Sequence, residues 1–290
     1  MSRRRATFDH GSMTARFVRR GSGKAVVAIA GIIVLLVTLA AALAPVVAPY
    51  TPDVQEMSLS LHGGSSTHLL GTDKLGRDTF SRLLYGARTT LLSALFVVIL
   101  STVVGVVLGL VAGYFEGAVD LVVSRTLDIL LSFPALLLAL IIVAAFGRGI
   151  SNAVVALAIV YVPMIARLVR SACLVEKRLP YVEAARALGY SDARVMFRHI
   201  LPNTVPLLLV QAPIDFGYSI LDLAALSFLG LGVQPPTADW GSMLAEGRDY
   251  LLLSPRLAIV PGLAIMVVVV AFNLLGDGLR TRLERSGGGG

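Results

Sequence analysis

The sequence predicts an all-α integral membrane protein with six transmembrane helices and with both termini in the cytoplasm. The 290 residues are 56% hydrophobic and only 15% charged, and the mean hydropathy of +0.81 lies far above that of soluble domains. Six apolar runs reach or approach the ~20 residues that a helix needs to cross a bilayer. Most of the 25 basic residues lie in alternate connecting segments, as expected when these runs are threaded through a membrane.

The expected spans are residues 25–47, 89–113, 126–147, 152–172, 204–231 and 257–276. The first run is longer than the apolar core of a cleavable signal peptide, which is about 7–15 residues, so we interpret it as a retained anchor. Arg and Lys concentrate before the first span, between the fourth and fifth spans, and after the sixth. The positive-inside rule therefore places both termini and the 173–202 loop in the cytoplasm.

These spans divide the chain into four regions: a cytoplasmic N-terminal segment (1–24), the first transmembrane helix with an extracytoplasmic segment (25–88), a core of five transmembrane helices (89–280) and a cytoplasmic tail (281–290). The glycines that end the tail have the composition of a flexible linker. Late in the extracytoplasmic segment, apolar residues from Leu75 to Leu84 recur among charges, which predicts a short interfacial helix before the second span.

The second span carries a stripe of small residues at strict four-residue spacing, Ser101, Gly105, Gly109 and Gly113. Such a stripe lets another helix approach closely, so we expect it to be a helix-packing face rather than a substrate site. At the start of the third span, Arg125 and Asp128 are three residues apart and are expected to pair as a structural anchor near the cytoplasmic face.

The connection between the fourth and fifth spans is polar and helix-prone, which is unusual for a membrane protein loop. Residues 183–188 are strong helix formers, Gly189 permits the left-handed backbone that ends a helix, and Ser191 or Asp192 can cap a second helix. Arg194 and Arg198 lie one turn apart on that second helix, and Pro202 marks a break before the fifth span. Its apolar residues Val195, Met196 and Phe197 would be exposed unless the helix docked on a partner. The residues alone also allow a helix that lies on anionic lipid.

The fifth span carries three polar residues on one helical face, Gln211, Asp215 and Asp222. Acidic groups are unfavourable in hydrocarbon, so this face is expected to meet protein or a water-filled cavity. One hypothesis is that it lines a translocation path, where the carboxylates would attract a peptide amino terminus. The alternative is a packing face whose carboxylates form hydrogen bonds to neighbouring helices.

Several site classes are excluded by the residues. The string from Gly21 to Lys24 resembles a phosphate-binding loop, but Val18 and Ala25 stand where that motif requires glycine and a hydroxyl residue. A single cysteine and four scattered histidines indicate no metal site, and no nucleophile and base are placed together. We therefore expect no enzyme activity, no metal and no cofactor bound by this chain.

The passage EAARALGYSDARVMFRHILP at 183–202 resembles the motif of ATP-binding-cassette (ABC) importer permeases. Six positions match that motif: Glu183, Ala184, Ala185, Gly189, Leu201 and Pro202; His199 stands where an isoleucine is usual. The similarity covers nearly the whole chain and is closest to the C-type permease of dipeptide and oligopeptide importers. It includes LGTDKLGRDTFSRLLYGAR at 70–88, GLVAGYFEGAVDLVVSRTLDILLSFPALLLAL at 109–140, LSFLGLGVQPPTADWGSMLAEGR at 226–248 and PGLAIMVVVVAFNLLGDGLR at 261–280.

This resemblance implies the type I ABC importer permease fold, a multi-pass protein of the bacterial cytoplasmic (inner) membrane. The loop between spans four and five would be a coupling helix that contacts an ATPase, through Glu183, Ala184, Ala185, Gly189, Arg194, Arg198, Leu201 and Pro202. The implied partners are a homologous second permease, two ATP-binding subunits or domains that bind ATP and Mg²⁺, and an extracytoplasmic substrate-binding protein.

The implied substrates are dipeptides or oligopeptides, and the alternatives are nickel, glutathione or haem carried by related importers. A stand-alone secondary transporter is a further alternative. It would need no ATPase, and its cytoplasmic loop would have no reason to carry a docking helix.

Overall fold

The computed structural model describes residues 22–287, and every regular element in this range is a helix. The predicted N-terminal segment lies outside the described residues up to residue 21, as do residues 288–290 of the predicted tail. The elements are α2 (Ser22–Ala42), α3 (Ala44–Val47), η1 (Met57–Leu59), α4 (Thr79–Phe115), α5 (Gly117–Leu131), α6 (Ala135–Phe146), α7 (Ile150–Glu176), α8 (Pro180–Ala187), α9 (Asp192–Val195), the π-helical turn η2 (Met196–Ile200), α10 (Leu201–Phe228), α11 (Trp240–Arg248) and α12 (Arg256–Gly287).

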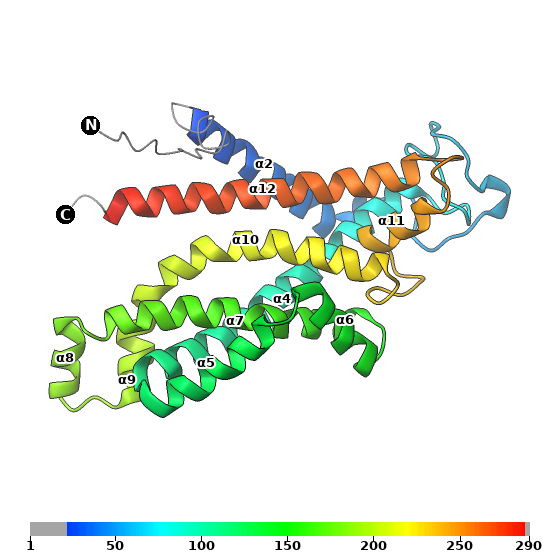
Figure 1. Cartoon of the computed structure of the whole chain (residues 1–290). Helices are drawn as coiled ribbons and strands as arrows, with labels where there is room; N and C mark the ends of the chain where they lie inside the picture. The colour runs from blue at the N-terminus through cyan, green and yellow to red at the C-terminus, as the bar shows by residue number, and fades with distance from the viewer. Residues whose placement is uncertain (1–21, 288–290) are drawn as a thin grey trace, which may run out of the picture.

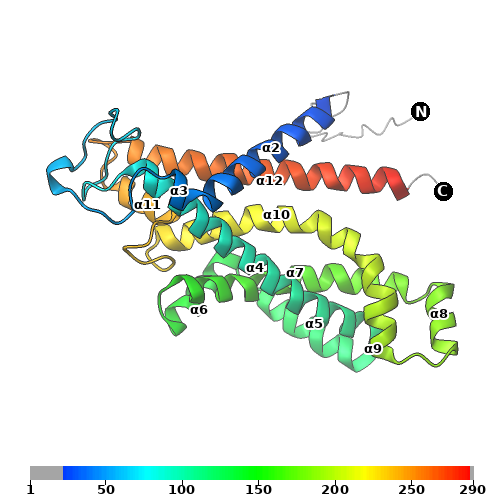
Figure 2. The same cartoon turned by 180° about the vertical axis from the view of Figure 1, so that it is seen from behind.

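The helices form an elongated bundle whose two ends carry different parts of the chain (Figure 1). The start of α2, the end of α12 and the short helices α8 and α9 gather at one end, and the 48–78 segment and α11 lie at the other (Figure 2). The segments that the positive-inside rule assigns to the cytoplasm thus share one end, and the predicted extracytoplasmic segments share the other. The predicted all-α membrane architecture is confirmed.

Five helices of the described residues are long and apolar enough to cross a membrane, and the bent pair α5–α6 makes six if it counts as one broken span. This bent pair replaces the single straight span predicted at 126–147. Helix α5 begins at Gly117, and α5 and α6 meet at 91°. Proline disfavours the helical conformation of the residue before it, so Phe133-Pro134 ends the first helix and lets a second start in a new direction.

The second predicted span, 89–113, is only the middle of helix α4. The side chain of Asp78 caps α4 by accepting a hydrogen bond from the Ser81 backbone N–H at 2.7 Å, so the helix starts ten residues before the predicted boundary. The prediction of a separate interfacial helix between Leu75 and Leu84 is therefore wrong. Most of those residues belong to the first turns of α4, and Arg82 is buried there rather than facing lipid headgroups.

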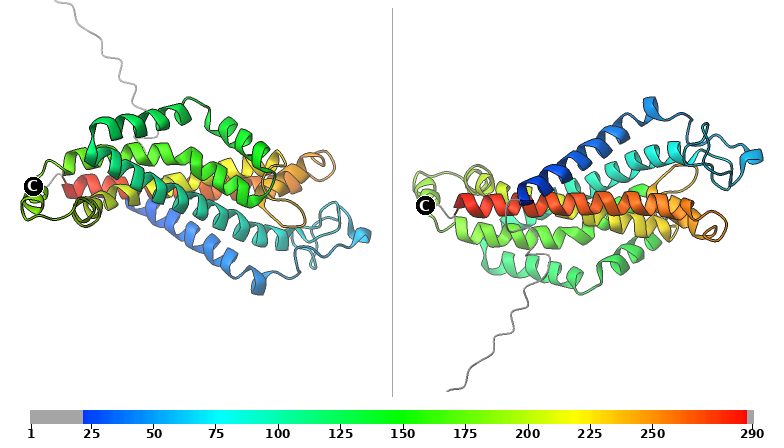
Figure 3. Two further views of the ribbon diagram at one scale, coloured as in Figure 1. Left: turned by 90° about the horizontal axis from the view of Figure 1, so that it is seen from below. Right: turned by 90° about the horizontal axis from the view of Figure 1, so that it is seen from above.

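Helices α4, α7 and α10 form the centre of the bundle, with α2 and the bent pair α5–α6 on opposite flanks (Figure 3). The largest buried cluster joins these central helices to α11 and α12, and includes Leu91, Val97, Leu157, Ile220 and Trp240. The predicted pair of Arg125 with Asp128 is not the one formed, because Asp128 accepts from Arg167 of α7 at 2.5 Å. Asp120 likewise pairs with Arg170, so the two carboxylates connect α5 to α7, and Asp120 also accepts from the Ser124 hydroxyl within α5 at 2.9 Å.

Candidate functional site

The small-residue stripe of α4 lies against α7 along three successive turns. A Cβ atom built on Gly105 would lie 2.8 Å from the Cβ of Ile165, and one on Gly109 would lie 2.5 Å from the backbone oxygen of Ala166. Both distances are too short for real carbon atoms, and Gly113 meets Cys173 in the same way. Ser101, the first member of the stripe, is fully buried. The two helices are therefore in backbone contact, and this face of α4 packs within the chain.

The segment between α7 and α10, residues 180–200, forms two short helices joined by a turn, as predicted; we call it the coupling segment. Gly189 adopts φ +77°, the left-handed conformation that ends α8. Ser191, one of the two predicted caps, accepts a hydrogen bond from the backbone N–H of Arg194 at 3.4 Å and starts α9.

The break expected at Pro202 does not occur. Helix α9 continues through the π-helical turn η2 into α10, so that Asp192–Phe228 is one helix of 37 residues. Pro202 lies in the first turn of α10, where its missing N–H and fixed φ are tolerated because the π-helical turn before it changes the hydrogen-bonding register. The coupling segment is thus continuous with a membrane-spanning helix.

The apolar residues of the coupling segment divide into a buried and an exposed set. Val195 and Met196 were expected to need a partner chain, but they are buried inside this chain. They pack with Val182 and Ala185 of α8 on the cytoplasmic ends of α4 and α7. Phe197 is the exception among the three predicted residues, since its side chain is half exposed.

The outer face of the coupling segment combines exposed apolar and basic side chains. Leu188 is 73% exposed, and Phe197 is 49% exposed. Among the eight predicted coupling residues, Ala185 is buried and Leu201 is partly buried. The other six are exposed: Glu183, Ala184, Gly189, Arg194, Arg198 and Pro202. The structure therefore brings most of the predicted coupling residues to one end of the bundle, with only part of the set available to another molecule.

The polar face of α10 is occupied by contacts within the chain. The amide of Gln211 donates to Asp215 at 2.8 Å, and the hydroxyl of Tyr161 on α7 donates to Asp222 at 2.8 Å. Asp215 is buried, and nearby Ser219 is fully buried with no hydrogen-bond partner for its hydroxyl oxygen among the described residues. The Asp222 contact is of the kind that the packing alternative expects. Tyr161 was missed by sequence reasoning, because a lone tyrosine in an apolar span carries no signal of its partner.

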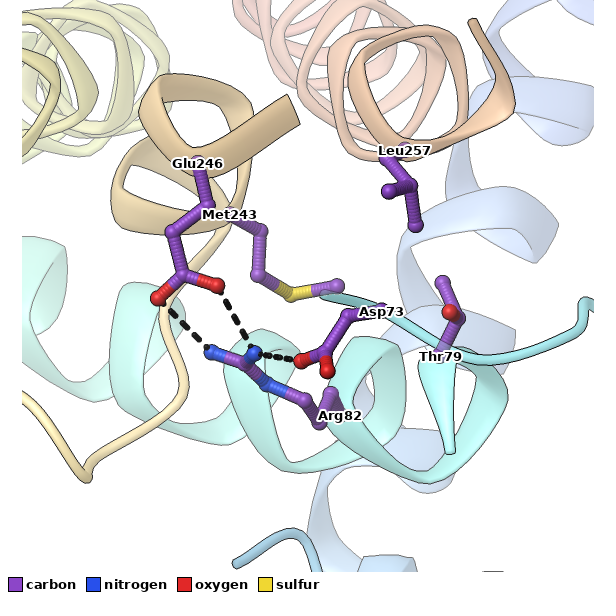
Figure 4. Close-up of a pocket in the computed structure, with 6 residues that line it drawn as sticks. All are labelled: Asp73, Thr79, Arg82, Met243, Glu246 and Leu257. Atoms are coloured by element: carbon purple, nitrogen blue, oxygen red, sulfur yellow. Dashed lines mark hydrogen bonds and ion pairs between the residues drawn. The ribbon is translucent and has the colours of Figure 1, made fainter. Parts of the chain in front are cut away.

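A second polar cluster, at the extracytoplasmic end, was also missed. Asp73 and Glu246 hold two arginines that are each only 2% exposed, Arg77 and Arg82. Figure 4 shows Arg82 between the two carboxylates. Arg77 donates to Asp73 at 2.6 Å and to Glu246 at 2.8 Å, while Arg82 donates to Glu246 at 2.9 Å and also contacts Asp73. We call these four residues the ionic cluster.

The opposite charges of the ionic cluster compensate one another. Burial on its own would raise the pKa of Asp73, but the two guanidinium groups and the backbone N–H groups of Leu75 and Arg77 lower it below its usual value. Two positive charges therefore face two negative charges. The cluster joins the 48–78 segment, α4 and α11, so it locks the extracytoplasmic end into one unit.

A further buried acid stands beside the ionic cluster at the start of α11. Asp239 caps that helix through the Ser242 backbone N–H at 3.1 Å and accepts from the Thr90 hydroxyl of α4 at 2.7 Å. Burial raises the pKa of Asp239, and these hydrogen bonds act in the opposite direction.

Residues 22–287 contain no group of three metal-ligating side chains, so this part of the chain provides no evident place for a metal ion.

A family model described as "Binding-protein-dependent transport system inner membrane component" matches residues 105–286. The glutathione transport system permease protein GsiD of Pectobacterium atrosepticum is 46% identical over 269 residues, which cover 92% of this chain and 89% of that protein. GsiD of Escherichia coli O157:H7 is 46% identical over 256 residues, or 88% of this chain and 84% of the relative.

Among solved structures, the fold resembles the inward-facing MetNI methionine ABC transporter, with a TM-score of 0.57 and 21% identity over 70% of this chain and 96% of that chain. An amino acid ABC transporter crystallised with histidines gives a TM-score of 0.54 and 22% identity, over 70% of this chain and 94% of that chain. At such identities the likeness supports the fold and no more. The family model spans more than half of the chain, and the relatives match almost all of it. The chain therefore belongs to the binding-protein-dependent transport system inner membrane components, as a multi-pass permease subunit of an ABC importer.

Proposed function

We propose that this permease belongs to an importer that carries glutathione or a comparably small peptide across the bacterial cytoplasmic membrane. The observation that carries the proposal is the 46% identity, over about nine-tenths of both chains, to a protein named as a glutathione transport permease. Glutathione is itself a tripeptide, so this substrate falls within the alternatives that the sequence left open and close to the expected dipeptides and oligopeptides. The relatives favour glutathione over the longer peptides.

Energy would enter through the coupling segment. Its exposed face, with Leu188, Phe197, Arg194 and Arg198, offers apolar and basic contacts on the side where ATP-binding subunits would dock. The partner subunits would bind ATP and Mg²⁺, since this chain carries no matching phosphate-binding loop. Because α9, η2 and α10 form one helix, a displacement of the docked segment would act directly on a membrane-spanning element.

The complete importer would contain this chain, a homologous second permease, two ATP-binding subunits or domains and an extracytoplasmic binding protein. Transport would follow alternating access, in which ATP-driven closure of the ATPases opens the permease pair outward and hydrolysis resets it. The binding protein would dock at the end of the bundle that carries α11 and the 48–78 segment.

The polar face of α10 stays a candidate for the translocation path. Gln211, Asp215 and Asp222 are engaged inside the chain in this conformation, so path lining would require the α7–α10 contact to open during the cycle. The hydrogen bond from Tyr161 to Asp222 is the contact that such opening would break.

The function is tested by uptake into vesicles that hold the complete complex, with the binding protein outside and ATP inside. Labelled glutathione is compared with a dipeptide, a longer peptide and a nickel chelate. ATP-dependent glutathione uptake in preference to the other three supports the proposal, and preference for another substrate refutes the glutathione assignment. Uptake driven by an ion gradient without ATP would instead establish secondary transport.

The path is tested in the same vesicles with Asp215→Asn and Asp222→Asn. These amides retain size and hydrogen bonding but remove the charge, so a path role requires altered uptake or selectivity. Unchanged uptake and selectivity in both variants would leave only the packing role.

A further inference from the structure

Besides the apolar packing described above, the side chain of Tyr114 makes polar contacts that connect the cytoplasmic end of α4 to both helices of the coupling segment. Its hydroxyl donates to the carboxylate of Asp192, the first residue of α9, at 2.6 Å. The guanidinium of Arg186, on α8, lies over the Tyr114 ring at 4.7 Å from the ring centroid. Tyr114 is only 5% exposed, whereas Asp192 and Arg186 are exposed, so a buried side chain of α4 meets two charged groups at the surface of the coupling segment. One side chain therefore contacts the coupling segment on either side of the Gly189 turn.

The end of α4 is fastened to α7 at the same place. The ammonium group of Lys177, directly after α7, donates to the backbone oxygen of Tyr114 at 2.6 Å and to Glu116 at 2.7 Å. The Lys177 ion pair lowers the pKa of Glu116, first through the hydrogen bond and then through the charge. Together with the backbone contact at Gly109 and Gly113, these contacts hold the cytoplasmic end of α4 against α7.

The opposite end of α4 is built into the extracytoplasmic unit. Arg82 belongs to the ionic cluster with Glu246 of α11, and Thr90 donates to Asp239. The indole N–H of Trp240 donates to the backbone oxygen of Leu83 at 3.0 Å. Helix α4 has 37 residues and so is about 55 Å long at 1.5 Å per residue. It joins polar contacts at the two ends of the bundle without interruption.

We propose that Tyr114 is the positioning residue through which the coupling segment moves α4, and that α4 carries this motion to the extracytoplasmic unit where a binding protein would dock. The inference rests on the proposed docking of the coupling segment on an ATPase. It adds a second route to the continuous helix α9–η2–α10, because Tyr114 transmits displacement to a different span. The same contact would link binding-protein docking at the far end to ATP binding by the ATPase subunits, because coupling between two binding sites is reciprocal, and the rate of ATP hydrolysis serves as its readout.

The test uses the complete complex in vesicles and measures the ratio of binding-protein-stimulated to basal ATP hydrolysis, together with uptake. Tyr114→Phe removes only the hydroxyl and keeps the ring that Arg186 covers. Asp192→Ala removes the acceptor, whereas Asp192→Asn keeps an oxygen acceptor without charge. Tyr181→Phe is the matched control, because its hydroxyl also bonds within this region, to Glu176 and Asn203, but does not contact α4.

Hydrogen bonds to charged groups typically change an equilibrium by about tenfold or more, so we expect the stimulation ratio of Tyr114→Phe and Asp192→Ala to fall about tenfold. The stimulation ratio should fall less for Asp192→Asn and should stay within about twofold of wild type for Tyr181→Phe. The double variant Tyr114→Phe with Asp192→Ala should lose no more than either single variant, because both substitutions remove the same contact. Co-purification of the subunits reports assembly separately.

Any of three outcomes would overturn the inference: an unchanged stimulation ratio in Tyr114→Phe, additive losses in the double variant, or an equal loss in Tyr181→Phe. If Tyr114→Phe fails to assemble, the difference between Asp192→Ala and Asp192→Asn decides it in the same way. Absence of glutathione uptake by the wild-type complex would refute the proposed substrate but not this inference, because the stimulation ratio is measured with whichever ligand the binding protein carries.

Discussion

Replacing Glu246 by glutamine tests whether the ionic cluster holds the extracytoplasmic end together. The change keeps the shape and one acceptor oxygen but removes a negative charge, so Arg77 and Arg82 would share the single carboxylate of Asp73. The two guanidinium groups are each 2% exposed and cannot recover this loss from water.

The magnitude follows from the burial of the partners. Removing one member of a buried ion pair costs about 3–5 kcal/mol. The Glu246 side chain is 20% exposed, and glutamine still accepts one hydrogen bond, so we expect the lower end of that range, about 3 kcal/mol. For a chain of this size, that loss lowers the melting temperature by about 6–12 °C.

The assay is thermal unfolding of the purified complex in detergent, followed by a thiol-reactive dye. Cys173 is the only cysteine of this chain and is fully buried, so it reacts only when the bundle opens, provided that the partner chains lack cysteine. The matched control is Arg248→Gln, which breaks the pair with Asp249 at 3.1 Å, where both side chains are more than half exposed. Exposed pairs contribute about 0–1 kcal/mol. Equal melting temperatures for Glu246→Gln and Arg248→Gln would refute the reasoning.

Three further predictions follow from the same structure. The pKa of Asp73 is lower in the folded chain than in the unfolded chain, so its contribution to stability is present at neutral pH and is lost as pH falls through the folded value. Asp73→Asn should therefore reduce the fall in melting temperature between about pH 6 and pH 3. An unchanged dependence of melting temperature on pH would contradict this. Gly109→Ala should destabilise or prevent assembly, because its Cβ would lie 2.5 Å from the Ala166 backbone oxygen, whereas Gly262→Ala, with its nearest atom at 3.6 Å, should be tolerated on the same melting assay. Leu188→Ser should reduce co-purification of the ATPase without changing the melting temperature, because Leu188 is 73% exposed; a large loss of stability would assign it to the fold instead.

The parts of the fold that were predictable depend on local pattern. Long apolar runs and the distribution of Arg and Lys predict the spans and their orientation, since both properties are readable over about 20 residues. The left-handed Gly189 and the capping Ser191 were likewise predictable, because each acts within one turn of chain. The bend at Phe133-Pro134 had a local signal, but an apolar run continues through it and hid the change of direction.

The parts that were not predictable depend on partners that are distant in the sequence. Arg82 looks like an interfacial cation until Glu246, 164 residues away, is placed beside it. The Tyr161–Asp222 and Tyr114–Asp192 contacts are of the same kind, separated by 61 and 78 residues. For this reason the burial of Val195 and Met196 was also missed, since the surface that covers them comes from α4 and α7.

The seam between α4 and α7 limits where a solute can pass. At Gly109 the space beside the backbone does not admit even a methyl group, so it does not admit a water molecule or a peptide. Along Gly105, Gly109 and Gly113 the seam is therefore closed to solutes by the backbone and side chains of α7. We therefore expect a solute path to follow other faces of the bundle.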